Sequence, residues 1–150
     1  MKYQIDQSGK IEDTRIHTVI ACSNKKQFSI MIKATTKRKI KKIYNLAGKP
    51  NIYTIQVFSV LIYLLIEKAN ITPEMMVIDR EYKGKEQLIK SYIMQLVFKR
   101  GKIKLSKEDL HFAEIGRKSQ AHKTAIQAFR KKKADFEAKG DEIIAQTMLF

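Results

Sequence analysis

Two aspartates stand at the ends of short apolar segments and are the first candidates for chemistry. Asp6 ends the segment Lys2-Tyr-Gln-Ile-Asp6, and Asp79 ends Met75-Met-Val-Ile-Asp79. Both segments have the composition of short strands. Carboxylate oxygens are the ligands that Mg²⁺ prefers, and a divalent cation held by them can promote attack on a phosphodiester. The alternative is that each is an ordinary strand-end residue, but the charge of the chain favours the chemical interpretation.

Basic residues dominate the 150-residue chain and cluster in two acid-free stretches. The formal net charge is +15, from 30 Lys and Arg against 15 Asp and Glu. Residues 14–66 contain ten Lys and Arg and no acid, and residues 115–134 contain seven and no acid. Such clustering predicts a polyanionic partner, with nucleic acid favoured over a membrane surface. The alternative is a charged, solvated face without a specific partner.

The basic residues expected to contact phosphates form two groups. One surrounds the apolar residues Ile40, Ile43 and Tyr44, and the other follows the last predicted strand. Long cationic side chains beside a reactive site would hold the backbone of the substrate. The predicted nucleic-acid-binding residues are Lys37, Arg38, Lys39, Lys41, Lys42, Arg117, Lys118, Lys123, Arg130 and Lys131.

Hydrophobic periodicity predicts an α/β fold in a single domain over residues 1–150. Alternating apolar residues predict strands at period two, and apolar residues three and four apart predict helices. The predicted strands are residues 2–8, 15–22, 27–34, 75–79 and 110–115. The predicted helices are residues 52–69, 85–99, 119–130 and 134–148, with residues 36–48 as a loop or short helix. Ser119 is the expected N-cap of the helix that it precedes.

Other compositional features point to a cytoplasmic protein. Cys22 is the single cysteine, so no disulfide framework forms within one chain, and its apolar context favours a core residue over a nucleophile. The N-terminus is polar from Lys2 onward, unlike a signal peptide. The longest apolar run, residues 57–66, is shorter than the about 20 residues that span a bilayer. It predicts a buried core helix and no membrane partner.

The predicted order, three strands followed by helix-connected strands, resembles the ribonuclease H-like superfamily. The resemblance implies a five-stranded mixed sheet, with three antiparallel strands first, flanked by helices. It also implies that the first and fourth strands lie side by side, so that Asp6 and Asp79 converge. These residues would then be catalytic and would hold Mg²⁺ or Mn²⁺ in a two-metal site.

A third candidate comes from the segment that follows the fifth predicted strand. Residues 116–131 are similar to the last motif of the C-terminal endonuclease domain of the UvrC excision nuclease. The matching residues are Ala121, His122, Ala125, Ile126, Phe129, Arg130 and Lys131. The resemblance implies that His122 joins Asp6 and Asp79, either as a ligand of the second metal or as a group that assists the leaving oxygen. The alternative for His122 is a solvated helix residue.

Two features leave alternatives open. Residues 133–138 are similar to the final helix of ribonuclease H proper, which would make Asp135 a metal ligand in place of His122, although we favour His122. Ribonuclease H proper also carries a Glu in the helix before the fourth strand, and the corresponding positions near Thr54 or Gln56 are not acidic. Glu81 and Glu114 are possible substitutes for that missing acid.

The sequence thus predicts a Mg²⁺- or Mn²⁺-dependent nuclease. The alternative is a catalytically degenerate nucleic-acid-binding module of the same fold, since one acid of the family pattern is missing. The residues leave DNA, RNA, their hybrid and branched junctions open as substrates, and a homodimer is possible.

Overall fold

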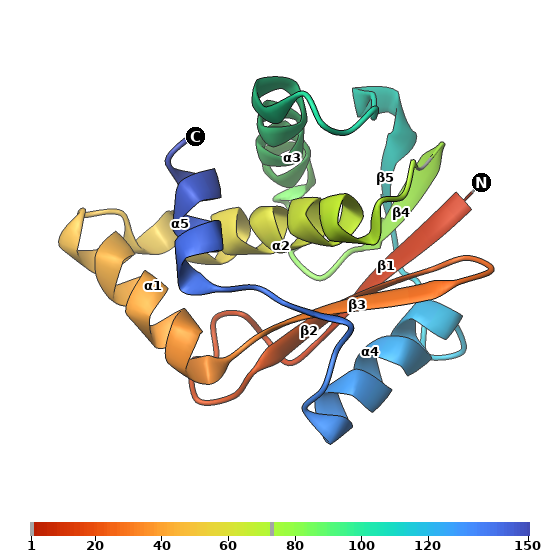
Figure 1. Cartoon of the computed structure of the whole chain (residues 1–150), viewed down its shortest axis with the longest axis horizontal. Helices are drawn as coiled ribbons and strands as arrows, with labels where there is room; N and C mark the ends of the chain where they lie inside the picture. Colours follow the sequence, from red (N-terminus) through yellow and green to blue (C-terminus); the bar gives the residue numbers. More distant parts are fainter. Residues whose placement is uncertain (1, 73) are drawn as a thin grey trace.

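The computed structural model describes residues 2–72 and 74–150, and it has the α/β architecture that the sequence predicts (Figure 1). In chain order the elements are β1 (Lys2–Ser8), β2 (Thr18–Ser23), β3 (Gln27–Ile32), α1 (Ala34–Leu46), η1 (Pro50–Ile52), α2 (Tyr53–Ala69), β4 (Met75–Asp79), α3 (Glu86–Arg100), η2 (Lys107–Asp109), β5 (Leu110–Ala113), α4 (Gln120–Lys131), β6 (Phe136–Glu137) and α5 (Gly140–Thr147).

One mixed sheet organises the molecule, in the order β5-β4-β1-β2-β3-β6. β1, β2 and β3 form an antiparallel meander. β4 is parallel to β1, and β5 is parallel to β4. The predicted mixed sheet with an antiparallel meander is confirmed, but the predicted number of five strands is wrong, because β6 adds a sixth strand parallel to β3.

β6 also corrects the predicted helix over residues 134–148. α4 ends at Lys131, and Lys132 takes the left-handed conformation with φ 52°, which breaks the helix. The next residues pair with β3, Phe136 with Ile30 and Glu137 with Met31. The final helix therefore starts only at Gly140.

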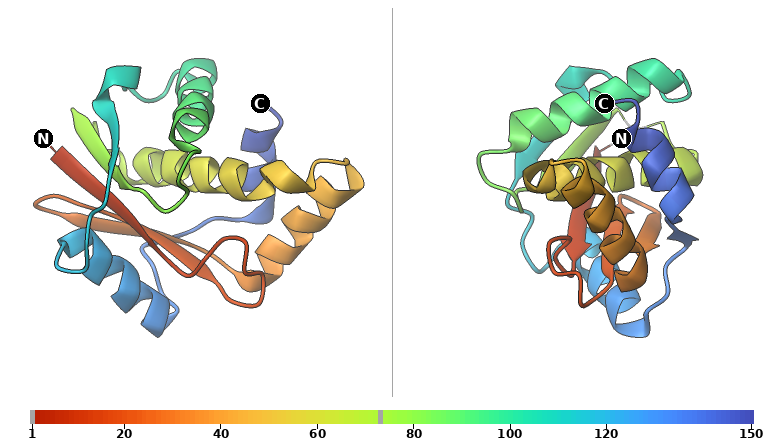
Figure 2. Two further views of the ribbon diagram at one scale, coloured as in Figure 1. Left: turned by 180° about the vertical axis from the view of Figure 1, so that it is seen from behind. Right: turned by 90° about the vertical axis from the view of Figure 1, so that its left-hand side faces the viewer.

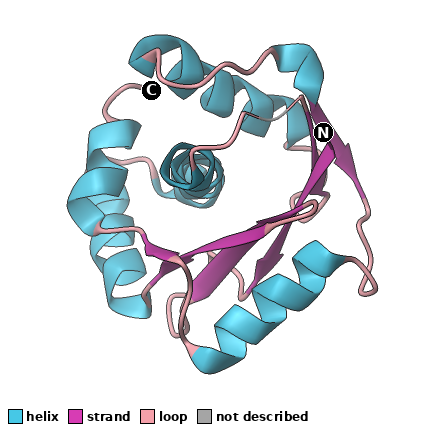
Figure 3. Ribbon diagram, turned by 45° about the vertical axis from the view of Figure 1, so that its right-hand side comes forward, coloured by secondary structure: helices cyan, strands magenta, loops and turns pink. Residues whose placement is uncertain are grey.

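The helices cover the two faces of the sheet unequally. α4 lies against one face, over β1, β2 and β3 (Figures 2 and 3). α2 lies on the opposite face, where it is surrounded by α1, α3 and α5 (Figure 3). α4 turns Ala121, Ala125 and Ala128 toward the sheet, and these small side chains allow a close approach. The first turn of α4, which carries His122, is thus brought near the central strand β1.

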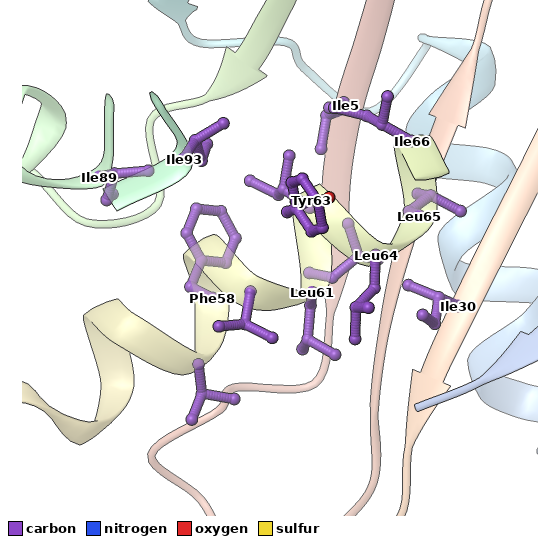
Figure 4. Close-up of a cluster of buried hydrophobic side chains, with 14 of the residues drawn as sticks. Ile5, Ile30, Phe58, Leu61, Tyr63, Leu64, Leu65, Ile66, Ile89 and Ile93 are labelled. Carbon is purple, nitrogen blue, oxygen red and sulfur yellow. The ribbon is translucent and has the colours of Figure 1, made fainter. Parts of the chain in front are cut away.

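α2 forms the centre of the hydrophobic core. Its residues are buried all round the helix from Tyr53 to Ile66, apart from the half-buried Thr54. Figure 4 shows its side chains between Ile5 and Ile30 of the sheet and Ile89 and Ile93 of α3. Burying one such aliphatic side chain stabilises a fold by about 1.5–3 kcal/mol. Residues Pro50–Ala69 are long and apolar enough to cross a membrane, but 72% of their most apolar window is buried inside the protein, as predicted for a core helix.

Cys22 belongs to the same core. It lies on β2 and is fully buried. Burial raises the pKa of its thiol to about 12, so the reactive thiolate is disfavoured at neutral pH. The prediction of a core residue is confirmed.

Candidate functional site

Asp6 and Asp79 come together because β1 and β4 are parallel neighbours. Ile5 pairs with Ile78 in the register of the two strands. The next residues, Asp6 and Asp79, therefore stand at adjacent positions and on the same face of the sheet. The hydrogen-bonded ladder of the central strands fixes this position, so the placement of both carboxylates follows from the sheet itself.

The carboxylate of Asp6 is buried, with 6% of the residue exposed. Its Oδ1 accepts a hydrogen bond from the backbone N–H of Gln7 at 2.8 Å, and its Oδ2 lies 2.8 Å from Nδ1 of His122. Burial raises the pKa of Asp6, against the lowering effect of the Gln7 and His122 bonds, and the negative charge of Asp79 raises it further. Any added positive charge in this place would favour the ionised form.

His122 reaches Asp6 from α4, the helix that covers one face of the sheet. The hydroxyl of Ser119 caps α4 by accepting a hydrogen bond from the backbone N–H of His122 at 3.1 Å, which confirms the predicted N-cap. With Asp6 ionised, Nδ1 of His122 is the donor in their 2.8 Å contact. Nε2 has no hydrogen-bond partner among residues 2–72 and 74–150. The Asp6 contact therefore orients the ring and leaves Nε2 uncommitted.

Asp79 connects β4 to the loop that leads into α4. Its Oδ1 accepts a hydrogen bond from the backbone N–H of Ile115 at 3.0 Å. This bond holds the chain just after β5, and the same loop supplies Gly116 and Arg117 to the site. Asp79 thus helps to position the segment that delivers His122.

These residues border one open pocket with a volume of about 340 Å³. All three predicted catalytic residues line it, together with Arg80 and the predicted phosphate-binding residue Arg117, which can contact an anionic ligand. The complete lining is Asp6, Gln7, Asp79, Arg80, Glu81, Glu114, Gly116, Arg117 and His122.

Asp135 lies away from this pocket. Its carboxylate accepts hydrogen bonds from the backbone N–H of Ser29 at 2.9 Å and from the Ser29 hydroxyl at 3.3 Å. Ser29 belongs to β3, and β2 separates β3 from β1. The alternative prediction that Asp135 is a metal ligand with Asp6 is therefore wrong, because this carboxylate instead ties the chain before β6 to the sheet.

Lys37 is also misassigned by the sequence pattern. It is fully buried, and its Nζ donates hydrogen bonds to the carbonyls of Lys10 at 3.0 Å and Asp13 at 2.7 Å and to Oγ1 of Thr18 at 2.9 Å. These bonds fasten the β1–β2 loop to α1. The prediction that Lys37 contacts phosphate is therefore wrong, since its ammonium group is enclosed by protein oxygens.

Most other predicted nucleic-acid-binding residues are on the surface. Arg117 borders the pocket, and Lys118 precedes the α4 cap. Arg38 is exposed but donates a hydrogen bond to the carbonyl of Thr14 at 2.8 Å. Lys41 is half-buried on α1. The remaining predicted residues are exposed on α1 and α4: Lys39, Lys42, Lys123, Arg130 and Lys131.

We expect Lys37→Met to lower the free energy of unfolding by about 1–3 kcal/mol, because it leaves buried oxygens without their donor. Burial lowers the pKa of Lys37 from 10.5 to about 8. The folded protein therefore releases this proton at a lower pH than the unfolded chain, and between these values the unfolded state binds more protons. Linkage makes the wild-type free energy of unfolding rise with pH across this window, and Lys37→Met removes that contribution.

Urea unfolding of both proteins at several pH values between about 7 and 10 measures the effect. The exposed Lys42→Met is the control and should stay within about 0.5 kcal/mol of the wild type. An unchanged stability of Lys37→Met, or a wild-type minus variant difference that is flat with pH, contradicts the assignment of a buried, charged Lys37.

The helix before β4 carries no acid where the family pattern has a Glu. The first turn of α2 contains no acidic residue, and Gln56 instead accepts a hydrogen bond from the hydroxyl of Tyr44. Burial raises the pKa of Glu81, and the charges of Asp79 and Asp6 raise it further, which places Glu81 in the field of both aspartates. Glu81 and Glu114, the two possible substitutes, both line the pocket.

Sequence reasoning missed the residues that support the site from the side of α2. The hydroxyl of Tyr82 accepts a hydrogen bond from Nε2 of Gln7 at 3.1 Å and lies 3.3 Å from Oε1 of Glu12. Its ring packs edge-on against Phe58 of α2, with 5.1 Å between centroids. The one feature of the sequence that could have indicated this role is that Tyr82 follows Asp79 by only three residues.

The donor set of the pocket has the chemistry of a hard divalent cation site, because Asp6, Asp79 and Glu81 offer carboxylate oxygens. Across the described ranges, however, no group of three or more His, Cys, Asp or Glu side chains is already gathered closely enough to hold a metal ion. Nδ1 of His122 is hydrogen-bonded to Oδ2 of Asp6 and is therefore not free to bind a cation in this structure. The residue types are those that bind Mg²⁺ or Mn²⁺ in proteins, but these side chains are spread around the pocket rather than gathered at one point.

Comparison with known proteins gives no relative: no protein-family model, no curated protein and no solved structure matches the chain significantly.

Proposed function

We propose that this chain is a nuclease of the ribonuclease H-like type that hydrolyses phosphodiester bonds in nucleic acid with Mg²⁺ or Mn²⁺. One observation carries the proposal: Asp6, Asp79 and His122 come from three separate elements and border the same pocket. The parallel pairing of β1 with β4 supports it, since the resemblance implies that the first and fourth strands lie side by side.

In the proposed reaction, Asp6 and Asp79 would hold the cation, which supplies a Lewis acid for the scissile phosphate. Asp6 also orients His122 through Nδ1, so that Nε2 is the ring nitrogen left to exchange a proton with an oxygen of the substrate. Arg80 and Arg117 line the pocket and would bind phosphate oxygens there.

The surface around the pocket supports a polyanionic substrate. The acid-free segment over residues 115–134 contributes exposed cations on both sides of the α4 cap, Lys118 before it and Lys123 after it. Contacts of this kind hold the sugar-phosphate backbone without reading its sequence. The affinity for nucleic acid should accordingly fall steeply as salt increases.

A second candidate function is a binding module of the same fold without catalysis. It is favoured by the first turn of α2, which has no acid, and by the spread of the ligand side chains around the pocket. In this case the chain would bind nucleic acid through the same surface but would not cleave it.

A screen of end-labelled single-stranded DNA, duplex DNA, RNA, hybrid and four-way junction in Mn²⁺ separates the two candidates. We expect cleavage of at least one substrate by the wild type and loss of cleavage when EDTA removes the cation. Binding of several substrates without cleavage in Mn²⁺ or Mg²⁺ would assign the chain to the binding class. If the protein neither binds nor cleaves any substrate of the panel, both candidates are overturned.

A further inference from the structure

We propose that a groove on the outer side of α3 binds single-stranded nucleic acid, with a base stacked on Phe98 and phosphates held by Lys90 and Lys107. The groove shares no lining residue with the pocket that Asp6 and Asp79 border. The inference rests on the proposed function in one respect, because it names a substrate with an unpaired segment. The binding itself requires neither a cation nor turnover.

Phe98 is an aromatic residue on the exposed side of α3. The helix buries Ile89, Ile93 and Leu96 against the core. Phe98, by contrast, is 86% exposed, more than any other large apolar residue that the structure describes. The half-buried Met94 lies one turn earlier on the same side of the helix. The outer face of α3 therefore carries apolar surface where a helix of this kind usually presents polar residues.

This apolar surface belongs to a groove of about 380 Å³ between α3 and η2, which we call the α3 groove. Met94 and Phe98 form its apolar part, and Lys90, Lys99 and Lys107 form its charged part. The other lining residues are Gln or Ser, and among the described residues that line the groove none is acidic. The α3 groove thus combines an aromatic ring with positive charge alone, which is complementary to a polyanion.

The charges of the groove are largely uncommitted. Lys99 donates a hydrogen bond to the carbonyl of Leu149. The ammonium groups of Lys90 and Lys107 have no hydrogen-bond or ion-pair partner within residues 2–72 and 74–150. The surrounding sequence adds to this positive potential, because residues 87–107 form a further acid-free stretch. Its cations are Lys90, Lys99, Arg100, Lys102, Lys104 and Lys107.

Single-stranded nucleic acid fits these features better than a duplex or a second copy of the chain. Its bases are free to stack on an aromatic ring while a basic groove follows its backbone. A duplex keeps its bases stacked on one another and offers mainly phosphates to the groove. A second copy that used the same face would bring lysines against lysines, and like charges across an interface disfavour association.

The α3 groove is remote from the proposed catalytic pocket. At 1.5 Å per residue, Phe98 lies about 18 Å along α3 from Glu86, the first residue of the helix. Figure 1 shows that α3 and α4, which carries His122, lie on opposite sides of the sheet. A strand that occupies both places must therefore extend over several nucleotides, so the groove would hold an unpaired segment that lies outside the cleaved position.

Binding measured in EDTA tests the inference without cleavage. Fluorescence anisotropy compares a labelled oligothymidylate of about 15 nucleotides with a duplex of the same length. We expect Phe98→Ala to weaken binding of the single strand by at least about fivefold. Its affinity for the duplex should stay within about twofold of the wild type. An oligouridylate titrated in parallel shows whether the groove prefers RNA or DNA.

The two parts of the groove predict different salt dependences. The double variant Lys90→Gln/Lys107→Gln should make the log–log salt slope for the single strand shallower by about 0.7 for each phosphate contact that is lost. Phe98→Ala should leave this slope unchanged, because stacking releases no counterions.

Matched variants separate stacking from apolar contact. Phe98→Trp should keep the affinity of the wild type within about twofold, whereas Phe98→Leu should lose affinity like Phe98→Ala. Met148→Ala is the control, since Met148 is 78% exposed but borders a different pocket. It should stay within about twofold of the wild type.

The outcomes distinguish this inference from the function on which it rests. A wild type that binds no nucleic acid overturns the proposed function and this inference together. Single-strand affinity that is unchanged in Phe98→Ala overturns the inference alone, and so do equal losses for the single strand and the duplex. Light scattering tests the other occupant: a wild-type dimer that Phe98→Ala converts into a monomer would make the groove an interface between copies and overturn the inference.

Discussion

Asp79→Asn is expected to lower kcat/KM for Mn²⁺-dependent cleavage by at least about 100-fold. The substitution removes a negative charge that would hold the cation but changes the size of the side chain very little. The amide oxygen of Asn can still accept the hydrogen bond from the N–H of Ile115, which Asp79 accepts at 3.0 Å. The loop into α4 should therefore keep its position, and the loss should concern catalysis and metal binding rather than folding. Initial rates at saturating Mn²⁺, with circular dichroism as a check of the fold, measure the effect.

Asp135→Asn is the matched control for this prediction. Its carboxylate contacts Ser29 on β3, outside the pocket, so its cleavage rate should stay near that of the wild type. His122→Ala should instead lose activity like Asp79→Asn, because its ring contacts Asp6 within the pocket. An active Asp79→Asn combined with an inactive Asp135→Asn would move the catalytic centre to the β3 edge of the sheet.

The largest expected effect on stability comes from Gly9→Ala, with a loss of about 2–4 kcal/mol in the free energy of unfolding. Gly9 has a φ of +78°, which L side chains rarely adopt. A Cβ here would lie 2.5 Å from the backbone oxygen of His17 and 2.6 Å from Cε2 of Phe129. Neither neighbour moves easily, because the two rings stack at 4.3 Å and Nε2 of His17 donates to the carbonyl of Phe129 at 2.7 Å.

Gly84→Ala separates the close contact from the backbone strain. Gly84 has a similar φ of +81°, but a Cβ there would meet nothing within 4 Å. Its substitution should lower the free energy of unfolding only by the strain of placing Ala in the left-handed conformation, about 1–2 kcal/mol. Denaturant unfolding of both variants measures the difference. Equal losses for the two substitutions would show that the contact between the β1–β2 loop and α4 is unimportant.

The sequence predicted the features that depend on local signals. The alternation in residues 2–8 and the apolar burst ending at Asp79 predicted β1 and β4 at their observed bounds. Ser119 predicted the start of α4, because an N-cap hydroxyl acts on the helix that immediately follows. With these elements in place, the adjacency of Asp6 and Asp79 follows from the parallel pairing of the two strands.

The features that the sequence did not predict depend on contacts between distant segments. Lys37 lies in a run of exposed cations, and only the meeting of α1 with the β1–β2 loop encloses its ammonium group. β6 is two residues long, too short for a periodic pattern, and it exists because β3 offers a free edge.

The position of bound Mn²⁺ shows whether Asp6 and Asp79 hold the catalytic cation. Anomalous scattering from crystals soaked in Mn²⁺ locates the ion independently of any assay of turnover. We expect an anomalous peak in the pocket, in contact with the carboxylates of Asp6 and Asp79, that is absent from crystals of Asp79→Asn. An ordered Mn²⁺ ion elsewhere on a protein that cleaves nucleic acid, with this pocket empty at saturating Mn²⁺, would contradict it.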